Sequence, residues 1–400
     1  MDHFNIVREI RELKSQLSYA KKVGVFMGAG TSCALGLPNI SKLTTDIESS
    51  LPENSKLAYS IVKRDLEAKA AGGYSVSIED ILNQVRRIRE ITSDDAERNF
   101  LTVTGVVAKQ LDLDICKEIY KLIDAAEEKA NLAVPKRFFA WLNMQNRDFV
   151  TEVFTPNYDL IIEKSLESIR APYFDGFVGS FEPFFWQESV EQVVKSSDLT
   201  SNWLRLWKIH GSLSWFWKEN PVTKAYKVIR QVKAMNPNSP SNELVIYPSK
   251  EKYASSRRQP FIVYFDRLKN YLLSGELLFL ITGYSFLDQH INEVLFNCMR
   301  QNSRLHVLVF FYLDAEVVRL QPSIVGYLNI SVYGPKKAII GGVLGDWSFD
   351  ENELKPKEPN YSYWDKQSET LILGDFNNLV TFLVSNSGRT NEIEVVASEN

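Results

Sequence analysis

The sequence lacks several features that would point to particular classes of protein. Only three cysteines are spread over 400 residues, too few for a disulfide framework or a four-thiolate zinc site. The longest apolar runs, Leu277–Ile281 and Val307–Tyr312, are far too short to span a bilayer. The first 17 residues are charged and amphipathic and lack the apolar core of a signal peptide. We therefore expect a cytoplasmic protein with reduced thiols and no membrane contact.

An excess of positive charge is also missing. The chain has 46 Lys and Arg against 50 Asp and Glu, with a formal net charge of −4. Such a surface does not attract nucleic acid as a whole, and no carboxylate-rich metal motif indicates a nuclease, so direct nucleic-acid binding is not expected. The hydrophobic fraction of 44% is ordinary for a globular protein with a buried core.

Hydrophobic periodicity predicts an α/β fold. Residues 4–19 have helical spacing, and 23–27 form an apolar strand that runs into a glycine turn. Further strands are expected at 149–154, 204–209, 244–247, 277–282 and 307–312. Their spacing of roughly 30 to 60 residues is typical of parallel strands joined by crossovers. Residues 41–144 are expected to be a helical insertion, with a capping box at Ser77–Asp80. The expected domain spans 1–386, with its core at about 20–40 and 145–386, and residues 387–400 are expected to be a flexible tail.

The turn after the first apolar strand reads GAGTSCALGLP over residues 28–38. Glycines allow a diphosphate to approach the backbone, and a following helix offers N–H groups. The turn is not a P-loop, because no lysine follows at the required position, and the third glycine of the dinucleotide fingerprint would fall on Cys33. A purely structural turn is the alternative interpretation.

Four other polar loops follow apolar runs. They are TPNYD at 155–159, HGS at 210–212, GYS at 283–285 and LGDF, whose Gly374, Asp375 and Phe376 come after Leu371–Leu373. Parallel strands bring loops at their carboxyl ends to one crevice, where ligands bind in open α/β sheets. Each loop alone also fits a structural turn or a structural histidine.

Taken together, the five motifs resemble those of the sirtuin family in order and spacing. GAGTS-x3-GLP is similar to the family's glycine-rich NAD loop, TPNYD to TQNID, HGS to the catalytic His-Gly, GYS to the GTS ribose loop, and LGDF to the closing Gly-Asp segment near the adenine. The resemblance covers about residues 20–385. It implies a Rossmann-like sirtuin fold with a parallel sheet and a large helical insertion, and it implies NAD as the substrate.

The chain departs from the family's deacetylases at several positions. The two CxxC pairs that follow the catalytic histidine are missing, since no cysteine lies between Cys116 and Cys298, so we expect no zinc module and no bound zinc. The family's Asp-Phe-Arg is replaced by residues 39–41, which read Asn-Ile-Ser, and the glutamine of TQNID by Pro156. Both changes argue against the usual acyl-lysine reaction.

The segments GYSFLDQHIN at 283–292, TPNYD and IYPSKEKY at 246–253 resemble the sirtuin-like proteins of bacterial anti-phage systems. That resemblance implies an NAD+ hydrolase that depletes NAD+ in infected cells. The length of the chain and the LGDF near its end are similar to the sirtuin-like partner of HerA-type hexameric ATPases. A homo-oligomer and such an ATPase partner are therefore expected.

The resemblance also implies roles for individual residues. Asn157 would position the nicotinamide ribose and the attacking water, His210 would be the general base, and Asp159 would orient the water or stabilise positive charge. The loop around the diphosphate would comprise Gly28, Ala29, Gly30, Thr31, Ser32, Leu37, Pro38 and Asn39. Gly283 and Ser285 would contact ribose or phosphate, and Asp375 and Phe376 would border the adenine.

Two other functions fit the same motifs. A zinc-independent deacylase or ADP-ribosyl transferase would need an open channel for a second substrate. A non-catalytic NAD-sensing subunit of an ATPase complex would need neither Asn157 nor His210, so the presence of both favours an enzyme.

Overall fold

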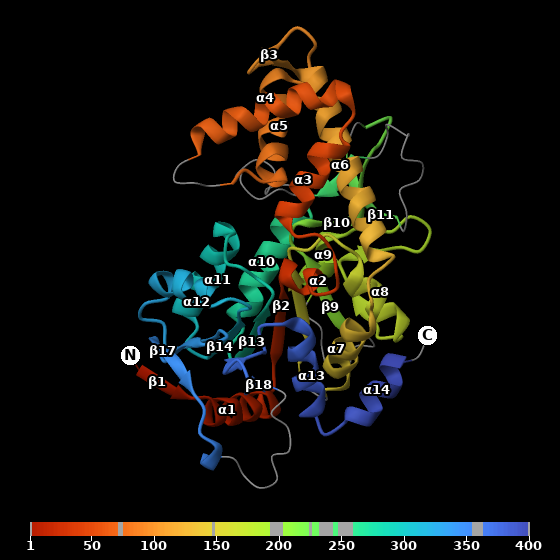
Figure 1. The fold of residues 1–400 in the computed structure, drawn as a ribbon. Coiled ribbons are helices and arrows are strands. Elements are labelled where there is room, and N and C mark those ends of the chain that lie inside the picture. The colour runs from red at the N-terminus through yellow and green to blue at the C-terminus, as the bar shows by residue number, and fades with distance from the viewer. Residues whose placement is uncertain are drawn as a thin grey trace.

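The computed structural model describes residues 2–70, 75–145, 149–192, 203–223, 226–231, 243–246, 259–353 and 363–398. A large sheet with helices on both faces forms the body of the molecule, and a group of helices from the first third of the chain stands at one end of it (Figure 1). Within these residues, no helix combines the length and the apolar character needed to cross a membrane.

The main sheet has ten strands in the order β1-β17-β16-β15-β14-β13-β2-β5-β9-β6. Among the described strands of this sheet, β16 alone runs antiparallel to its neighbours. The strands are β1 Asp2–Asn5, β2 Val23–Met27, β5 Glu152–Thr155, β6 Tyr173–Phe174, β9 Leu204–Lys208, β13 Leu277–Thr282, β14 Leu305–Phe310, β15 Ile330–Tyr333, β16 Lys337–Ile340 and β17 Val343–Ser348.

The central six strands, β9-β5-β2-β13-β14-β15, have the order 3-2-1-4-5-6 of doubly wound nucleotide-binding sheets. The chain leaves β2 toward β5 on one side and leaves β13 toward β14 on the other, so the order reverses between β2 and β13. This arrangement confirms the predicted α/β class. It also places the switch point of the sheet, where such folds bind ligands, beyond the carboxyl ends of β2 and β13.

Side chains that alternate along the strands divide the core into two layers. Val25 of β2 and Leu280 of β13 face one layer, while Phe26 and Phe279 face the other. Helices on both faces are what a buried parallel sheet requires. The first layer is covered by α1 Ile6–Tyr19, α7 Ala133–Met144, α8 Ile161–Ser168 and α13 Phe376–Ser385, and the second by α10 Phe261–Leu272, α11 Gln289–Gln301 and α12 Asp314–Leu320.

The helical insertion has a core of its own. It comprises α3 Ile40–Ser50, α4 Glu53–Lys69, α5 Ile78–Thr92, the short hairpin β3 Asn99–Phe100 and β4 Val103–Thr104, and α6 Gly105–Glu127. Helix α5 begins at the expected capping box, in which Ser77 and Asp80 exchange hydrogen bonds. The insertion ends earlier than expected, because α7 contributes Phe138 and Phe139 to the layer under the main sheet.

Some segments that the sequence analysis places in one parallel sheet have other positions. Residues 244–246 lie in β12 Glu243–Ile246, which pairs antiparallel with β10 Gly211–Glu219 in a second sheet; Tyr247, Pro248 and the rest of the 247–258 stretch are outside the described residues. That sheet also holds β7 Phe177–Val178, β8 Phe184–Phe185 and β11 Tyr226–Arg230, with the short helix α9 Gln187–Glu191 nearby in the chain. The two-residue strands β18 Trp364–Asp365 and β19 Thr370–Leu371 form a separate hairpin, so Leu371–Leu373 is not a strand of the main sheet.

The predicted flexible tail contains a helix instead. Helix α14 Thr390–Ser398 packs against α7, and its Ile393 is fully buried. The segment looks polar because seven of its nine residues keep contact with solvent, while the buried pair Ile393 and Ala397 has the i, i+4 spacing of one helix face. A short amphipathic helix of this kind is easily missed in a polar stretch.

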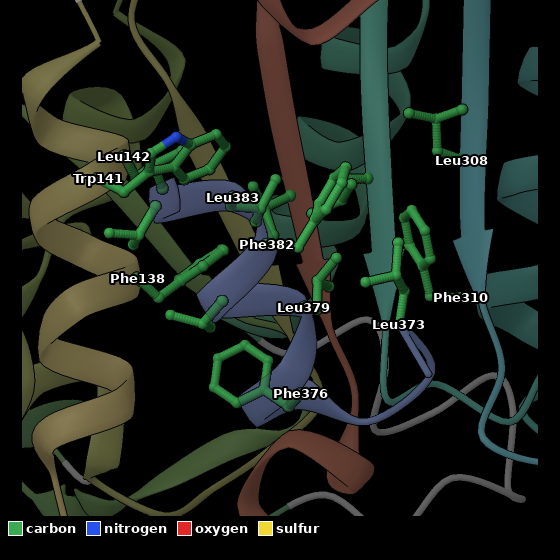
Figure 2. Close-up of a cluster of buried hydrophobic side chains, with 14 of the residues drawn as sticks. Phe138, Trp141, Leu142, Leu308, Phe310, Leu373, Phe376, Leu379, Phe382 and Leu383 are labelled. Carbon is green, nitrogen blue, oxygen red and sulfur yellow. The ribbon is translucent and has the colours of Figure 1, made fainter. Parts of the chain in front are cut away.

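The LGDF segment leads into the core rather than into an open site. Leu373 and Phe376 are both buried, and the ring of Phe376 lies 5.5 Å from that of Phe138 (Figure 2). Asp375 caps α13, because its side chain accepts hydrogen bonds from the N–H groups of Asn377 and Asn378. The aromatic ring thus anchors α13 on α7.

This packing predicts a large effect for Phe376→Ala. Removing a buried aromatic ring from a core costs about 3–5 kcal/mol, so we expect the free energy of unfolding in urea to fall by that amount. Phe181→Ala is a matched control, because that ring is completely exposed, and it should change the free energy by less than about 0.5 kcal/mol. Equal effects of the two substitutions would contradict the assignment of Phe376 to the core.

Candidate functional site

A cleft of about 720 Å³ lies beyond the carboxyl ends of β2, β5, β9 and β13. The insertion forms its opposite wall, so the cleft is bounded by the α/β body on one side and by helices on the other. It lies at the switch point described above, and its volume falls in the range of about 300–1,000 Å³ that small-molecule sites have.

Two loops meet at the base of the cleft with no space between them. The N–H of Gly28 donates to the carbonyl oxygen of Thr282 at 2.9 Å, and the N–H of Gly30 donates to that of Gly283 at 2.8 Å. A Cβ on Gly30 would lie 2.8 Å from the Cα of Gly283, and a Cβ on Gly283, whose φ is +65°, would lie 2.5 Å from the nitrogen of Thr31. These positions therefore need glycine because backbone packs on backbone.

The TPNYD loop is attached to the same glycine loop by its polar side chains. Nδ2 of Asn157 donates to the carbonyl oxygen of Gly28 and to Oγ of Ser32, both at 3.0 Å. Oγ of Ser32 donates in turn to Oδ2 of Asp159 at 2.7 Å. Asn157 and Asp159 are both more than nine-tenths buried. Because Nδ2 is used by the protein, Asn157 offers its carboxamide oxygen as an acceptor to a ligand.

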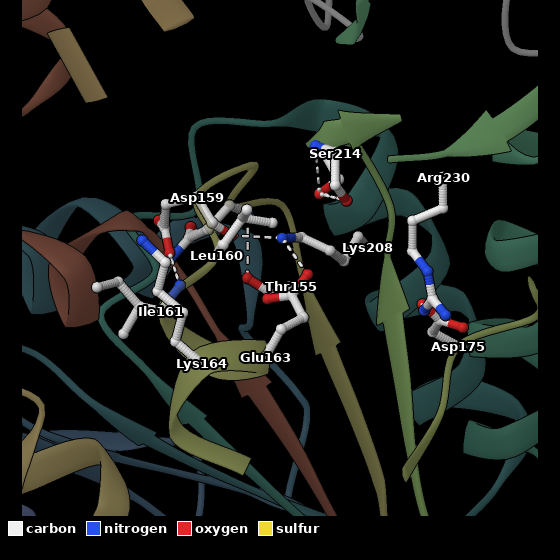
Figure 3. A network of polar contacts seen from close by, with 12 residues as sticks. Thr155, Asp159, Leu160, Ile161, Glu163, Lys164, Asp175, Lys208, Ser214 and Arg230 are labelled. Atoms are coloured by element: carbon white, nitrogen blue, oxygen red, sulfur yellow. Dashed lines mark hydrogen bonds and ion pairs between the residues drawn. The ribbon is translucent and has the colours of Figure 1, made fainter. Parts of the chain in front are cut away.

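A buried lysine joins the TPNYD loop to the strand that ends at the HGS motif. Lys208 is 1% exposed, and its Nζ donates to the carbonyl oxygen of Asp159 and to Oε1 of Glu163 (Figure 3). The backbone adds a further link, since the N–H of Leu213 donates to the carbonyl oxygen of Tyr158 at 2.8 Å. The loop after β5 and the loop after β9 are thus held together as one rigid wall.

His210 faces the cleft from the turn after β9. It is 6% exposed, and its Nε2 lies 3.1 Å from Oδ2 of Asp288, which comes from the loop after β13. Burial opposes the charge of Asp288, but the contact with His210 and the N–H groups of Ile291 and His290 outweigh it and lower the pKa of that carboxyl. Asp288 is therefore ionised at neutral pH and faces an imidazole.

The wall contributed by the insertion is partly acidic and partly apolar. Glu79 and Asp80, at the start of α5, line the cleft, as do Leu43 and Ile123.

Two other groups near the cleft are held in their neutral forms. Burial, followed by the charges of Glu79 and Asp159, raises the pKa of Tyr158 far above its usual value, so its hydroxyl stays protonated. Burial and then Asp159 also raise the pKa of Cys33, which makes its thiol a poor nucleophile.

Nine of the residues named from the sequence line this one cleft. They are Ala29, Ser32, Leu37, Pro38, Asn157, Asp159, His210, Gly283 and Ser285. They come from four segments that are far apart in the chain, and the structure brings them together as the strand order requires.

Six other named residues are not among the described residues that line the cleft. Gly28 and Gly30 pack against the loop after β13, and the hydroxyl of Thr31 donates to the carbonyl oxygen of Gly28. Asn39 caps α3 by accepting from the N–H of Lys42. Asp375 and Phe376 have the capping and core positions described above. The glycines support the site from below. Asn39 lies between two residues that line the cleft, Pro38 and Ile40, whereas Asp375 and Phe376 belong to the start of α13 and the core.

Sequence reasoning missed several residues of the cleft. Asp288 and His290 stand in the GYSFLDQHIN segment, but only their spatial position shows that Asp288 meets His210. The capping box identified Ser77 and Asp80 as a helix start, and nothing in it indicated that this helix end faces a ligand site. No group of three or more His, Cys, Asp or Glu suited to a metal ion occurs in the part of the chain that the structure describes.

Comparison with known proteins agrees with part of the resemblance. A family model described as a SIR2-like domain matches residues 151–333, a segment that runs from β5 to β15 and includes the TPNYD, HGS and GYS loops. No curated protein matches. Solved structures similar to this chain include a Sir2 homologue mutant in complex with 2'-O-acetyl ADP ribose, at 10% identity and a TM-score of 0.36, covering 74% of this chain and 82% of that one. A Sir2 homologue–NAD complex matches at 10% identity and a TM-score of 0.36, with 77% and 84% covered.

The loop packing predicts different effects for two neighbouring substitutions. Gly30→Val places its Cβ against the backbone of Gly283, so the free energy of unfolding should fall by about 3 kcal/mol or more. Ala29→Val adds the branched side chain one residue earlier, where the loop lines the cleft. It should change stability by less than about 1 kcal/mol and weaken NAD+ binding instead.

Chemical denaturation and a direct NAD+ binding measurement on both variants make this comparison. If Gly30→Val were as stable as wild type and had only lost affinity, the glycine would serve the ligand rather than the loop contact.

Proposed function

We propose that this chain is an NAD+ glycohydrolase, which cleaves NAD+ to nicotinamide and ADP-ribose. The observation that carries the proposal is the convergence of Asn157, Asp159 and His210 on one cleft at the switch point of a doubly wound sheet. An amide acceptor, a carboxylate and an imidazole can together position the ribose, stabilise positive charge on it and take a proton from water.

The cleft presents two kinds of groups that suit the two parts of NAD+. The edge formed by Ala29, Ser32, Gly283 and Ser285 presents backbone and hydroxyl groups of small residues, which suits a diphosphate and a ribose. The TPNYD and HGS loops present the ionisable groups, which suits the nicotinamide ribose. Glu79 and Asp80 add negative charge near the same cleft, which favours a cationic nicotinamide ring.

The reaction breaks the bond between C1' of the ribose and the nicotinamide nitrogen, and the bonding pair leaves with neutral nicotinamide. Positive charge then develops on the ribose, and the carboxylate of Asp159 stabilises it. Oδ1 of Asn157 accepts a hydrogen bond from a ribose hydroxyl or from the attacking water, and so fixes the geometry. A C–O bond forms as water attacks C1', and His210 takes the proton that the water loses.

Two other functions remain alternatives. A deacylase or ADP-ribosyl transferase would use the same groups with a second substrate, but Pro156 replaces the glutamine of the family motif and the CxxC pairs are missing. A non-catalytic NAD sensor would bind the ligand without turnover. The enzyme is favoured because His210 is paired with an ionised carboxylate, an arrangement that a binding site alone does not need.

We expect His210→Ala and Asn157→Ala each to lower the rate of nicotinamide release by about 10²- to 10⁴-fold, the usual effect of losing a general base or its equivalent. His306→Ala is the control, because that histidine contacts Ser331 at 3.2 Å in the main sheet and does not line the cleft. Its turnover should stay near wild type even where its melting temperature falls.

The measurement is nicotinamide release from NAD+ by the purified chain, with NAD+ affinity and melting temperature followed for each variant. Affinity without release in the wild-type protein would favour the sensor. If an acetyl-lysine peptide were consumed faster than NAD+ alone, the deacylase would be the better assignment. Near-normal release by His210→Ala at unchanged stability would contradict the mechanism.

The biological role inferred from the resemblance is the effector of a bacterial anti-phage system, assembled as a homo-oligomer with a HerA-type ATPase. Bacteria that express the chain with such an ATPase should lose most of their NAD+ after phage infection, and bacteria with the His210→Ala chain should keep it. Equal NAD+ levels in the two strains after infection would contradict this role, although they would leave the activity of the purified protein open.

A further inference from the structure

We propose that Asp288 is a positioning residue for His210: it holds the proton of the neutral imidazole on Nε2 and stabilises the imidazolium that forms during turnover. The inference rests on the proposed function and names a residue that its mechanism has not used. Asp288 lies outside the five motifs and belongs to the other half of the sheet, after β13, whereas His210 follows β9.

The contact between the two side chains is short and buried. Nε2 of His210 lies 3.1 Å from Oδ2 of Asp288, and the side chains are 8% and 10% exposed. Solvent screens such a pair weakly, so the carboxylate acts on the imidazole more strongly than it would at the surface. Both residues line the cleft, which places the pair where the reaction would occur.

The second oxygen of Asp288 fixes the orientation of the carboxylate. Oδ1 accepts hydrogen bonds from the N–H of His290 at 2.8 Å and from that of Ile291 at 3.2 Å, which makes Asp288 the N-cap of α11. With Oδ1 committed to the helix, the carboxylate cannot turn over, and Oδ2 is the oxygen presented to His210. The helix therefore aligns the imidazole.

The loop that carries Asp288 is itself rigid. Nδ2 of Asn292 donates to the carbonyl oxygen of Phe286 at 2.9 Å, and the hydroxyl of Tyr284 donates to Oδ1 of Asn292 at 2.9 Å. The ring of Tyr284 packs on that of Phe26 at 4.8 Å. These contacts tie the loop to α11 and to β2, so the carboxylate is held in place before any ligand binds.

Other ionisable groups share the cleft, and each comes from a different element. Asp159 lies in the TPNYD loop and its Oδ2 accepts from Ser32, while Glu79 and Asp80 lie on α5 and His290 on α11. Burial raises the pKa of Tyr158 and of Tyr284, so both phenols remain neutral. Asp288 is in direct contact with His210, at 3.1 Å.

This arrangement sets the direction of proton transfer. At 3.1 Å the two atoms are in ion-pair contact without hydrogen-bond alignment. A small rotation of the ring would let the ionised carboxylate accept the hydrogen on Nε2, which would leave the basic lone pair of the neutral ring on Nδ1. When Nδ1 takes the proton from water, the new positive charge lies beside the negative charge of Asp288 and is stabilised by it. The carboxylate itself stays ionised throughout, as in other His–Asp pairs.

The decisive variant is Asp288→Asn. Asparagine is as good an N-cap as aspartate, so its oxygen should replace Oδ1 on α11. Its NH2 group then faces Nε2 of His210 and donates to it, which places the ring hydrogen on Nδ1 and removes the base. We expect nicotinamide release to fall by about 10²- to 10⁴-fold while the melting temperature changes little.

A matched variant measures the capping role separately. Asn5 caps α1 by the same pattern, accepting from the N–H groups of Val7 and Arg8, and lies far from the cleft. Asn5→Ala should lower stability by about 1 kcal/mol without changing the rate of release. Asp288→Ala should lose a similar amount of stability and also lose activity. If the loss of activity across these variants were proportional to the loss of stability, the proposal would be overturned.

A second readout does not depend on turnover. The chain has four histidines, so ¹⁵N NMR of the imidazoles, assigned with His210→Ala, can report which nitrogen of His210 carries the proton. We expect the Nε2–H form in wild type and the Nδ1–H form in Asp288→Asn. If wild type showed this signature but released no nicotinamide, the proposed function would fail and the pairing would stand. If release were normal and the tautomer did not change in Asp288→Asn, the pairing would be wrong.

Discussion

The backbone contact between the loops after β2 and β13 determines where everything else in the site can lie. Gly28 and Gly30 meet Gly283 with no room for a side chain, and two N–H···O=C hydrogen bonds join the loops. The chain turns in opposite directions after these strands, which makes this place the switch point of the sheet. Because the base is closed by backbone, a ligand must lie above it, against the side chains of the neighbouring loops.

The polar groups of the site are held on that closed base by successive hydrogen bonds. Asn157 binds the carbonyl oxygen of Gly28, and Ser32 holds Asp159. Lys208 holds the backbone of Asp159 from the next strand, two residues before His210. Each side chain with a proposed catalytic role is fixed by a buried partner rather than by a flexible loop, which is the condition for groups that must act without reorganisation. A substitution in the supporting contacts should therefore disturb several groups together.

The sequence predicted the parts of this structure that follow from local pattern. The uniformly apolar runs at β2 and β13 were predicted as strands with the bounds that the structure has, because strands buried on both faces leave an unmistakable signal. The motifs also indicated the cleft, because loops at the ends of parallel strands converge. Side-chain direction could not be predicted from local pattern.

Phe376 follows a glycine and an aspartate, and this sequence is also typical of a ligand-binding turn. The helix that begins there nevertheless turns the ring of Phe376 toward Phe138. Likewise, Ile393 and Ala397 are too few to reveal a helix in a polar segment, and only the surface of α7 gives them a partner.

The contact of Asp288 with His210 could not be predicted from the motifs, because it too depends on side-chain direction. Its sequence position is that of an ordinary N-cap, and its Oδ1 does serve as one. Its second oxygen reaches a residue 78 positions away, on the far side of the switch point, and no local pattern encodes that distance. The two side chains meet in the cleft even though β5 and β2 separate their strands in the sheet. One carboxylate thus serves the helix with one oxygen and the imidazole with the other. Under the proposed pairing, the helix cap holds the carboxylate that faces His210, so the stability of α11 and the proposed chemistry of the cleft depend on the same side chain.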